Sequence, residues 1–148
     1  MKIFIDGDGC PVKGLIDDIA KRYALEVILI TSIAHFTSRQ YQHFETILVD
    51  NISQAADIAI MNRVERGDIV VTQDFGLASM VLNKKAMAIS FTGRIYDIKE
   101  IDTMLFQRHL AQKIRRAGGN IKGPSKRTRA DDERFEKNLI KLIRRGNN

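Results

Sequence analysis

The chain has 148 residues, 44% of them hydrophobic and 28% charged, with 10 Gly and 2 Pro, which is typical of a folded globular protein of one domain. This composition excludes a disordered or collagen-like chain, and we expect a single domain over residues 1–148. The one cysteine, Cys10, excludes an internal disulfide. The sequence contains no run of about 18 apolar residues, so we expect a soluble, cytoplasmic protein with no membrane partner.

Positive charge is concentrated in the last quarter of the chain. The net charge is +6, but residues 113–148 hold 12 of the 24 Lys and Arg residues and 4 of the 18 Asp and Glu residues, a net charge of +8. Such a segment is typical of proteins that bind polyanions. About as often, however, a basic segment is only a solvated part of the surface. We expect this segment to bind nucleic acid, with RNA preferred over DNA as the partner. The expected contact residues are Arg115, Arg116, Lys122, Lys126, Arg127 and Arg129.

Short β-rich runs alternate with amphipathic stretches of helical length along the chain. This alternation predicts an α/β fold in which helices cover a central, mostly parallel sheet. Five runs fit one open sheet. The predicted strands are 2–6, 25–31, 46–50, 68–72 and 87–91.

The helices between these strands are predicted from apolar stripes and end signals. The second helix is expected to begin after Ser53, to turn Ile58, Met61 and Val64 toward the core, and to end at Gly67. A long helix is expected over 98–117. In the basic C-terminal segment, a loop around 122–127 leads to a final helix that packs on the domain through Phe135, Leu139, Leu142 and Ile143.

Acidic residues follow several of the predicted strands. Asp6 and Asp8 come after the first strand, Asp74 follows the fourth, and Asp57 lies in the first turn of the second helix. Ligands of open α/β sheets bind beyond the carboxyl ends of the strands, so these four side chains are expected to converge at one edge. Taken alone, an Asp after a strand is about as often a helix N-cap or a turn former as a site residue.

Clustered carboxylates favour Mg²⁺ or Mn²⁺, which prefer oxygen ligands. Zinc is disfavoured, because His35, His43 and His109 have no ligand spacing with one another or with Cys10. A metal held by Asp6, Asp8, Asp57 and Asp74 predicts phosphodiester hydrolysis, with the same four as catalytic residues. Thr72, Gln73 and Ser79 are expected to position water or a phosphate oxygen.

Two other functions remain open. A strand followed by Asp-x-Asp also describes phosphatases of the haloacid-dehalogenase type, although the later acidic pair of those enzymes is missing here. Alternatively, the acids are structural and the chain is a non-enzymatic RNA-binding module. Cys10 is a weak candidate nucleophile, because no His or Arg follows it at a motif spacing, although the start of a helix can lower the pKa of a thiol.

Several motifs resemble one bacterial family. The run 4–12 (Phe-Ile-Asp-Gly-Asp-Gly-Cys-Pro-Val) resembles the Asp-Ala-Asp-Ala-Cys-Pro-Val opening of the YaiI/YqxD family. The resemblance continues through 55–57, 67–78, 115–119, Gly123-Pro124 and Asp131-x-x-x-Phe135. It covers nearly the whole chain and implies a three-layer, PIN-like fold, and hence metal-dependent cleavage of RNA by Asp6, Asp8, Asp57 and Asp74.

The chain departs from the family pattern at two places. Gly7 and Gly9 stand where the family opening has Ala, which is expected to loosen the loop without removing a ligand. Gln54 or Ala55 occupies a position that is often acidic in the family, which weakens the case for a second metal. The number of metals, the substrate and the oligomeric state are left open.

Overall fold

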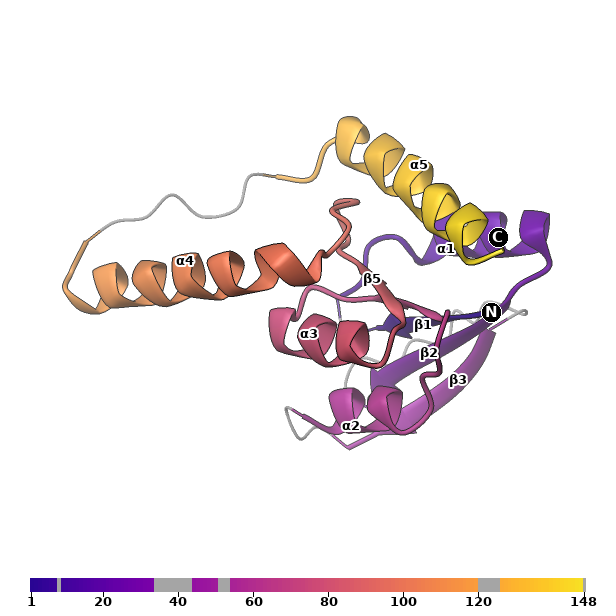
Figure 1. Cartoon of the computed structure of the whole chain (residues 1–148), viewed down its shortest axis with the longest axis horizontal. Helices are drawn as coiled ribbons and strands as arrows, with labels where there is room; N and C mark the ends of the chain where they lie inside the picture. Colours follow the sequence, from indigo (N-terminus) through magenta and orange to yellow (C-terminus); the bar gives the residue numbers. More distant parts are fainter. Residues whose placement is uncertain (8, 34–43, 51–53, 120–125, 148) are drawn as a thin grey trace.

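The fold is a three-layer α/β arrangement, seen in a computed structural model of the chain that describes residues 1–7, 9–33, 44–50, 54–119 and 126–147 (Figure 1). Within these ranges, five parallel strands form one sheet in the order β3-β2-β1-β4-β5. The strands are β1 (Lys2–Asp6), β2 (Glu26–Ser32), β3 (Phe44–Val49), β4 (Ile69–Val71) and β5 (Met87–Ile89). The predicted parallel sheet flanked by helices is therefore confirmed.

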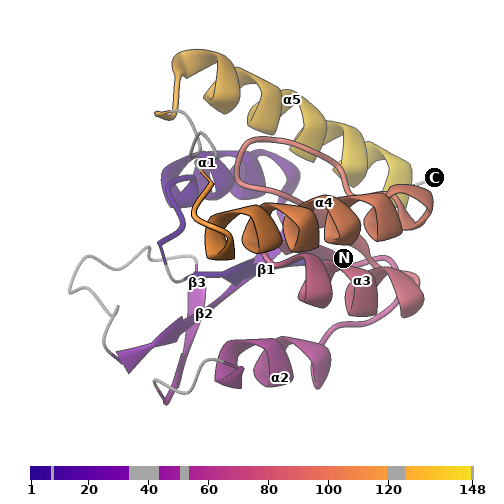
Figure 2. The ribbon, with the colours of Figure 1, turned by 90° about the vertical axis from the view of Figure 1, so that its left-hand side faces the viewer.

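Helices cover both faces of the sheet (Figure 2). On one face, α1 (Lys13–Tyr23) and α5 (Arg129–Gly146) pack against alternate residues of the strands, among them Ile3 and Ile5 of β1. On the other face, α2 (Ala55–Met61) and α3 (Phe75–Asn83) pack against the intervening residues, such as Phe4. The alternation follows from the two-residue period of a strand, and it makes both faces of the sheet apolar.

The last helix docks as its apolar stripe predicts. Phe135, Leu139, Leu142 and Ile143 are all fully buried against the α1 face of the sheet. Thr128 and Asp131 form a capping box that starts the helix, and Arg144 and Arg145 lie in its last turn, where the helix dipole favours positive charge. The C-terminal half of the basic segment is thus an ordered part of the domain.

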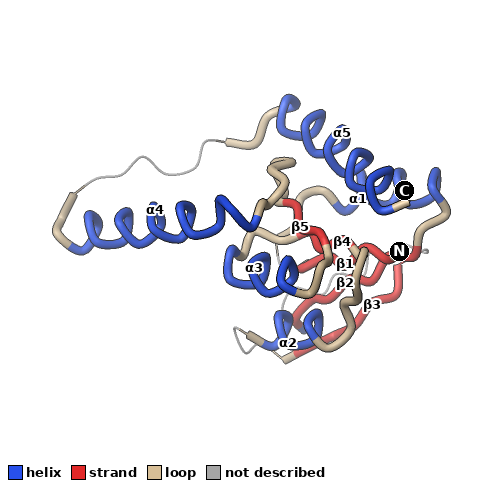
Figure 3. The backbone as a smooth tube through the Cα atoms, in the orientation of Figure 1, coloured by secondary structure: helices blue, strands red, loops and turns tan. Residues whose placement is uncertain are grey.

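Helix α4 (Ile98–Arg116) has a different position. It begins beside α3, with Ile101 buried, and then projects away from the rest of the fold (Figures 1 and 3). No helix within the described part of the chain is long and apolar enough to cross a membrane.

The second helix differs from its prediction. It ends at Met61 rather than near Gly67, and Ile58 is 59% exposed instead of facing the core. Val64 is buried, but it lies beyond the end of the helix. The predicted N-cap Ser53 lies outside the described residues. With apolar residues on several sides of a two-turn helix, periodicity could not identify the buried face.

Candidate functional site

The candidate site lies where the strand order of the sheet reverses. Chain order runs outward from β1 through β2 to β3 on one side, and from β4 to β5 on the other, so β1 and β4 are neighbours at the switch point. In open α/β sheets this crevice, at the carboxyl ends of the strands, is where ligands bind. Asp6 ends β1, and Thr72 and Asp74 follow β4.

Thr72 links the ends of the two strands. Its side chain is fully buried, and its hydroxyl donates to Asp6 Oδ2 over 2.9 Å and accepts from the Asp74 amide over 3.0 Å. Asp6 and Thr72 face the α2 and α3 layer, because each lies two residues beyond an inward residue of that layer, Phe4 and Val70. The predicted role of Thr72 in positioning water or phosphate remains a prediction, and its observed role is to hold Asp6.

Asp74 is the N-cap of α3. Its Oδ1 accepts from the amides of Gly76 at 2.8 Å and Leu77 at 3.2 Å. A carboxylate here is stabilised by the orphan amides and by the helix dipole. The structural role weighed for a lone Asp after a strand is therefore observed, and it fixes the Asp74 carboxylate at the same sheet edge as Asp6.

Asp57 comes to this edge from α2. It lies in the first turn of that helix, and burial, followed by the negative charges of Asp74 and Asp6 and a hydrogen bond with the Asp74 side chain, raises the pKa of Asp57 to about 6. Two carboxyl groups that share a hydrogen bond must hold a proton between them. Two of the other predicted acids, Asp6 and Asp74, therefore lie close enough to Asp57 to oppose its ionisation.

These acids are not arranged as the ligands of one cation in this structure. Across the described ranges, no group of three or more His, Cys, Asp and Glu side chains is arranged to hold a metal ion. Asp8 lies outside those ranges, as do His35 and His43. The donor chemistry nevertheless fits Mg²⁺ or Mn²⁺, because all three acids offer oxygen ligands and because a divalent cation would offset the charges of Asp74 and Asp6 that act on Asp57.

A hollow of about 390 Å³, here called the basic hollow, has Gln73 in its lining, the residue between Thr72 and Asp74. Two predicted residues line it, but each already has a partner: Gln73 accepts from the Phe91 amide over 2.8 Å, and Arg127 donates to the Phe91 carbonyl over 2.6 Å and pairs with Asp132. Sequence reasoning missed Arg134, which also lines this hollow and pairs with Asp131 at 3.3 Å. The lining residues are Gly9, Pro11, Gln73, Phe91, Thr92, Arg127, Asp131 and Arg134.

A second, more apolar hollow of about 400 Å³ lies between α2 and α3, with Asp57 in its wall. Ile58 and Met61, predicted as core residues, are in its lining together with Met80, which is 43% exposed, and the amides Gln54 and Asn62. Asp57 thus lines the apolar hollow, whereas Asp6, Asp57 and Asp74 are all absent from the lining of the basic one. Nothing in the sequence pattern distinguishes Ile58 from a core residue, so this hollow could not be predicted.

The other predicted site residues lie apart from the acids. Ser79 is half-buried in the second turn of α3, and no hydrogen bond among the described residues joins it to the acids. Arg115 and Arg116 end α4, Lys126 is exposed, and Lys122 lies outside the described residues. The Arg129 side chain is 93% exposed and pairs with Glu133 at 3.4 Å.

Cys10 is not an activated nucleophile. Its side chain is buried, and that burial raises the pKa of the thiol to about 11, although the Val12 backbone and Lys13 act in the opposite direction. The pKa-lowering effect expected at the start of a helix is therefore outweighed by desolvation.

The glycines after β1 have distinct roles. A Cβ on buried Gly7 would overlap Leu29 Cδ1 and lie 3.0 Å from the Ile30 carbonyl oxygen, and the Gly7 amide donates to that oxygen over 2.8 Å. Gly9 has a φ of 73°, which favours glycine. The prediction that glycine loosens the loop is wrong at Gly7, because the Gly7 backbone is hydrogen-bonded to Ile30 of β2.

Comparison with known proteins agrees with the motifs. A family model described as "Uncharacterized BCR, YaiI/YqxD family" matches residues 4–145. A "UPF0178 protein" of Alkaliphilus metalliredigens is 47% identical over 97% of this chain and 92% of its own length. One of Clostridium perfringens is 46% identical over 97% and 95%.

Among solved structures, Rae1 (YacP) from Bacillus subtilis aligns with a TM-score of 0.47 and 13% identity, over 99% of this chain and 96% of its own. The family is assigned from the sequence matches over nearly the whole chain and not from this structural similarity. The chain belongs to the YaiI/YqxD family.

Proposed function

We propose that the chain is a Mg²⁺- or Mn²⁺-dependent nuclease that hydrolyses RNA phosphodiesters, as the resemblance to PIN-like proteins implies. The observation that carries the proposal is the convergence of Asp6, Asp57 and Asp74 at the switch point, where burial and the charges of the other two acids raise the pKa of Asp57. A partly buried carboxyl group opposed by Asp74 and Asp6 is destabilised in its charged form, and a bound cation reverses that penalty.

Each acid has a role in this proposal. Asp6, Asp57 and Asp74 hold the cation, and Asp8 is a further predicted ligand. The cation supplies Lewis-acid activation of water and stabilises the leaving oxygen. Thr72 holds the Asp6 carboxylate through its hydroxyl, and the α3 N-terminus holds that of Asp74.

The two hollows suit a single-stranded substrate. The basic hollow is lined by Arg127 and Arg134, which would exchange their partners Asp132 and Asp131 for a phosphate. The apolar hollow beside Asp57 offers Met and Ile side chains to a base. Because these contacts are to the backbone and to the face of a base, they favour substrate shape over sequence.

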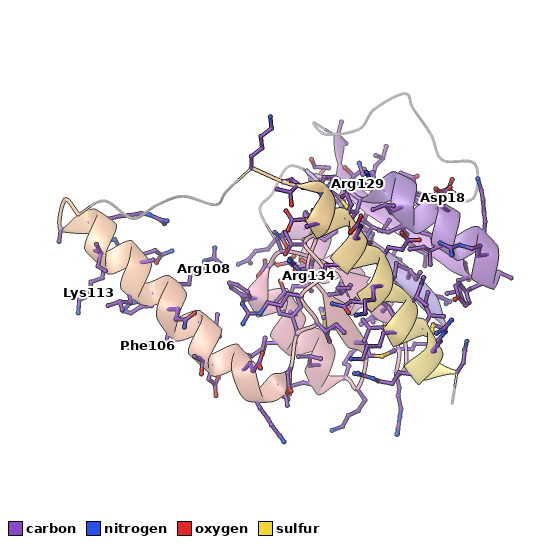
Figure 4. The ribbon with its side chains drawn as sticks, turned by 90° about the horizontal axis from the view of Figure 1, so that it is seen from above. Asp18, Phe106, Arg108, Lys113, Arg129 and Arg134 are labelled. Atoms are coloured by element: carbon purple, nitrogen blue, oxygen red, sulfur yellow. The ribbon has the colours of Figure 1, made fainter. Side chains whose placement is uncertain are left out.

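The test is cleavage of end-labelled single-stranded RNA by the full chain with Mn²⁺ or Mg²⁺. We expect Asp57→Asn and Asp6→Asn to lower the rate by about 100-fold or more, because isosteric amides lose the anionic ligand. The matched control is Asp18→Asn, since Asp18 is exposed on α1 (Figure 4), which packs on the opposite face of the sheet from α2 and α3. Intact RNA in excess Mn²⁺, or equal cleavage by all three variants, would overturn the proposal.

A non-enzymatic RNA-binding module is the second candidate, favoured by the structural roles already held by Thr72 and Asp74. It predicts RNA binding that survives chelation of divalent cations and Asp57→Asn. Charge reversal at Lys126 and Arg129, both exposed, then weakens binding and reduces its salt dependence. Binding of this kind without cleavage would replace the nuclease proposal.

A further inference from the structure

Helix α4 carries an exposed apolar stripe. Phe106, Leu110 and Ile114 are 64%, 45% and 40% exposed. They are spaced four residues apart, so they form one ridge along the helix. Exposed apolar ridges of this kind mark interaction surfaces more often than isolated exposed residues do.

The stripe is on the side of α4 that faces away from the domain. The opposite side carries Ile101, which is buried, and Arg108, whose guanidinium lies 5.9 Å from the centroid of the Phe75 ring. In Figure 4, Arg108 is on the side of α4 toward the body of the protein, whereas Phe106 and Lys113 point to the other side. The domain itself therefore uses one face of α4 and leaves the stripe to solvent.

Charge is distributed unevenly along the same helix. Acids lie near its start, with Asp102 next to the stripe, and bases lie near its end, with Lys113 next to the stripe. At 100° per residue, Asp102 and Lys113 both fall within about 40° of Phe106 around the helix axis. A second α4 in the same orientation would place like charges together, and one in the opposite orientation would place opposite charges together.

We propose that α4 pairs antiparallel with α4 of a second copy of this chain, forming a two-fold symmetric dimer. With the two-fold axis near position 108, Phe106 of each copy packs against Leu110 of the other, and Asp102 approaches Lys113. The pairing is self-complementary, as a two-fold interface must be. Nucleic acid fits the stripe less well, because three apolar side chains flanked by one acid, Asp102, and one lysine, Lys113, offer little net charge to a phosphate backbone.

The expected affinity is modest. A helix of 19 residues is about 28 Å long, so two such helices bury less surface than a standard protein interface. We therefore expect a dissociation constant in the micromolar range, on the order of 1–100 μM. The dimer rests on α4 alone and does not depend on the proposed nuclease activity.

The first test is sedimentation equilibrium of the full chain from about 1 to 500 μM, a range that brackets a micromolar constant. We expect a monomer–dimer equilibrium, and we expect Phe106→Glu and Leu110→Glu each to weaken it by about tenfold or more. The matched control is Ile33→Glu, which changes a similarly exposed apolar residue just after β2 and leaves the equilibrium unchanged. Circular dichroism verifies that each variant is folded.

The second test exchanges the charges. Asp102→Lys and Lys113→Asp each weaken the dimer, and the double variant restores it, because the antiparallel pair then has its charges reversed but still matched. If both single changes and the double variant leave the dimer unchanged, Asp102 and Lys113 of the two copies do not approach one another, and the antiparallel geometry is overturned.

A chain that stays monomeric at the highest concentration, or a dimer that Phe106→Glu leaves intact, overturns the proposal altogether. If the wild type is monomeric and Phe106→Glu instead abolishes binding to single-stranded RNA, the stripe is a nucleic-acid surface and not a dimer interface.

Discussion

The Thr72 hydroxyl donates a hydrogen bond to Asp6 Oδ2 over 2.9 Å, joining the ends of two neighbouring parallel strands. The same hydroxyl accepts from the Asp74 amide, so one buried side chain aligns an acid on each side of the switch point. This arrangement has a direct consequence for stability.

Replacing Thr72 by Val keeps the shape of the side chain but removes its hydroxyl. We expect a loss of about 1–3 kcal/mol in the free energy of unfolding, because the Asp74 amide and Asp6 Oδ2 lose a buried partner. Thr72→Ser, which keeps the hydroxyl, is expected to lose less. Urea denaturation of the three proteins measures the difference, and equal losses for Val and Ser would assign the effect to packing.

Gly7→Ala is expected to destabilise the chain by about 1–3 kcal/mol, because the new methyl group would overlap Leu29 Cδ1 and press on the Ile30 carbonyl. Gly14→Ala is the matched control. Gly14 lies in α1, where an added Cβ would meet no heavy atom within 4 Å, so the same change there is expected to stabilise by about 0.5–1 kcal/mol. Thermal melts show whether Gly7→Ala lowers and Gly14→Ala raises the melting temperature. An unchanged melting temperature for Gly7→Ala would show that Leu29 repacks without loss of stability.

Asp57→Asn is expected to stabilise the metal-free chain at neutral pH by about 1 kcal/mol, after allowance for solvent screening. Because the folded-state pKa of Asp57 is raised to about 6, the folded chain favours the protonated carboxyl group. The stability that this group contributes is present below the ordinary value near 4 and is lost as the pH rises through about 6.

The measurement is the unfolding free energy of wild type and Asp57→Asn at about pH 4 and about pH 7, on either side of the raised pKa, in a chelator. The gap between them is expected to be larger at the higher pH. Mn²⁺ is then expected to raise the melting temperature of the wild type more than that of the variant. A gap that is the same at both pH values would show that Asp57 does not titrate abnormally.

The Cys10 thiol is expected to resist modification in the folded chain, because it is buried and because its pKa is raised to about 11. At about pH 8 its reaction with a disulfide reagent is expected to be at least about 100-fold slower than in guanidinium, where the thiol regains its ordinary pKa. Absorbance of the released thiolate follows both reactions. Similar rates in the two conditions would show that Cys10 is accessible in the native state.

Much of this fold could be read from local pattern. The alternation of β-rich and amphipathic runs predicted a parallel sheet between helices, and the spacing of Phe135, Leu139, Leu142 and Ile143 predicted the buried face of α5. The acids at the strand ends were predicted because parallel strands bring their carboxyl ends to one edge of a sheet.

Other features depend on partners that are distant in sequence. Gln73 and Arg127 are expected from the sequence to face a substrate, but both are hydrogen-bonded to the backbone of Phe91. Gln73 is 18 residues from Phe91 in the sequence, and Arg127 is 36 residues from it. Ile58 is apolar like its neighbours, yet it lines a hollow because α2 is short and lies at the rim of the core.

Residue type and spacing therefore determined which secondary elements form and which side chains they carry to the sheet edge, since helix and strand periods are local properties of the backbone. Only the tertiary structure decided which polar atoms pair with one another, how far the neighbouring acids raise the pKa of Asp57, and which face of α4 stays exposed to solvent. Those outcomes depend on distances between segments, and such distances are set when the layers pack together.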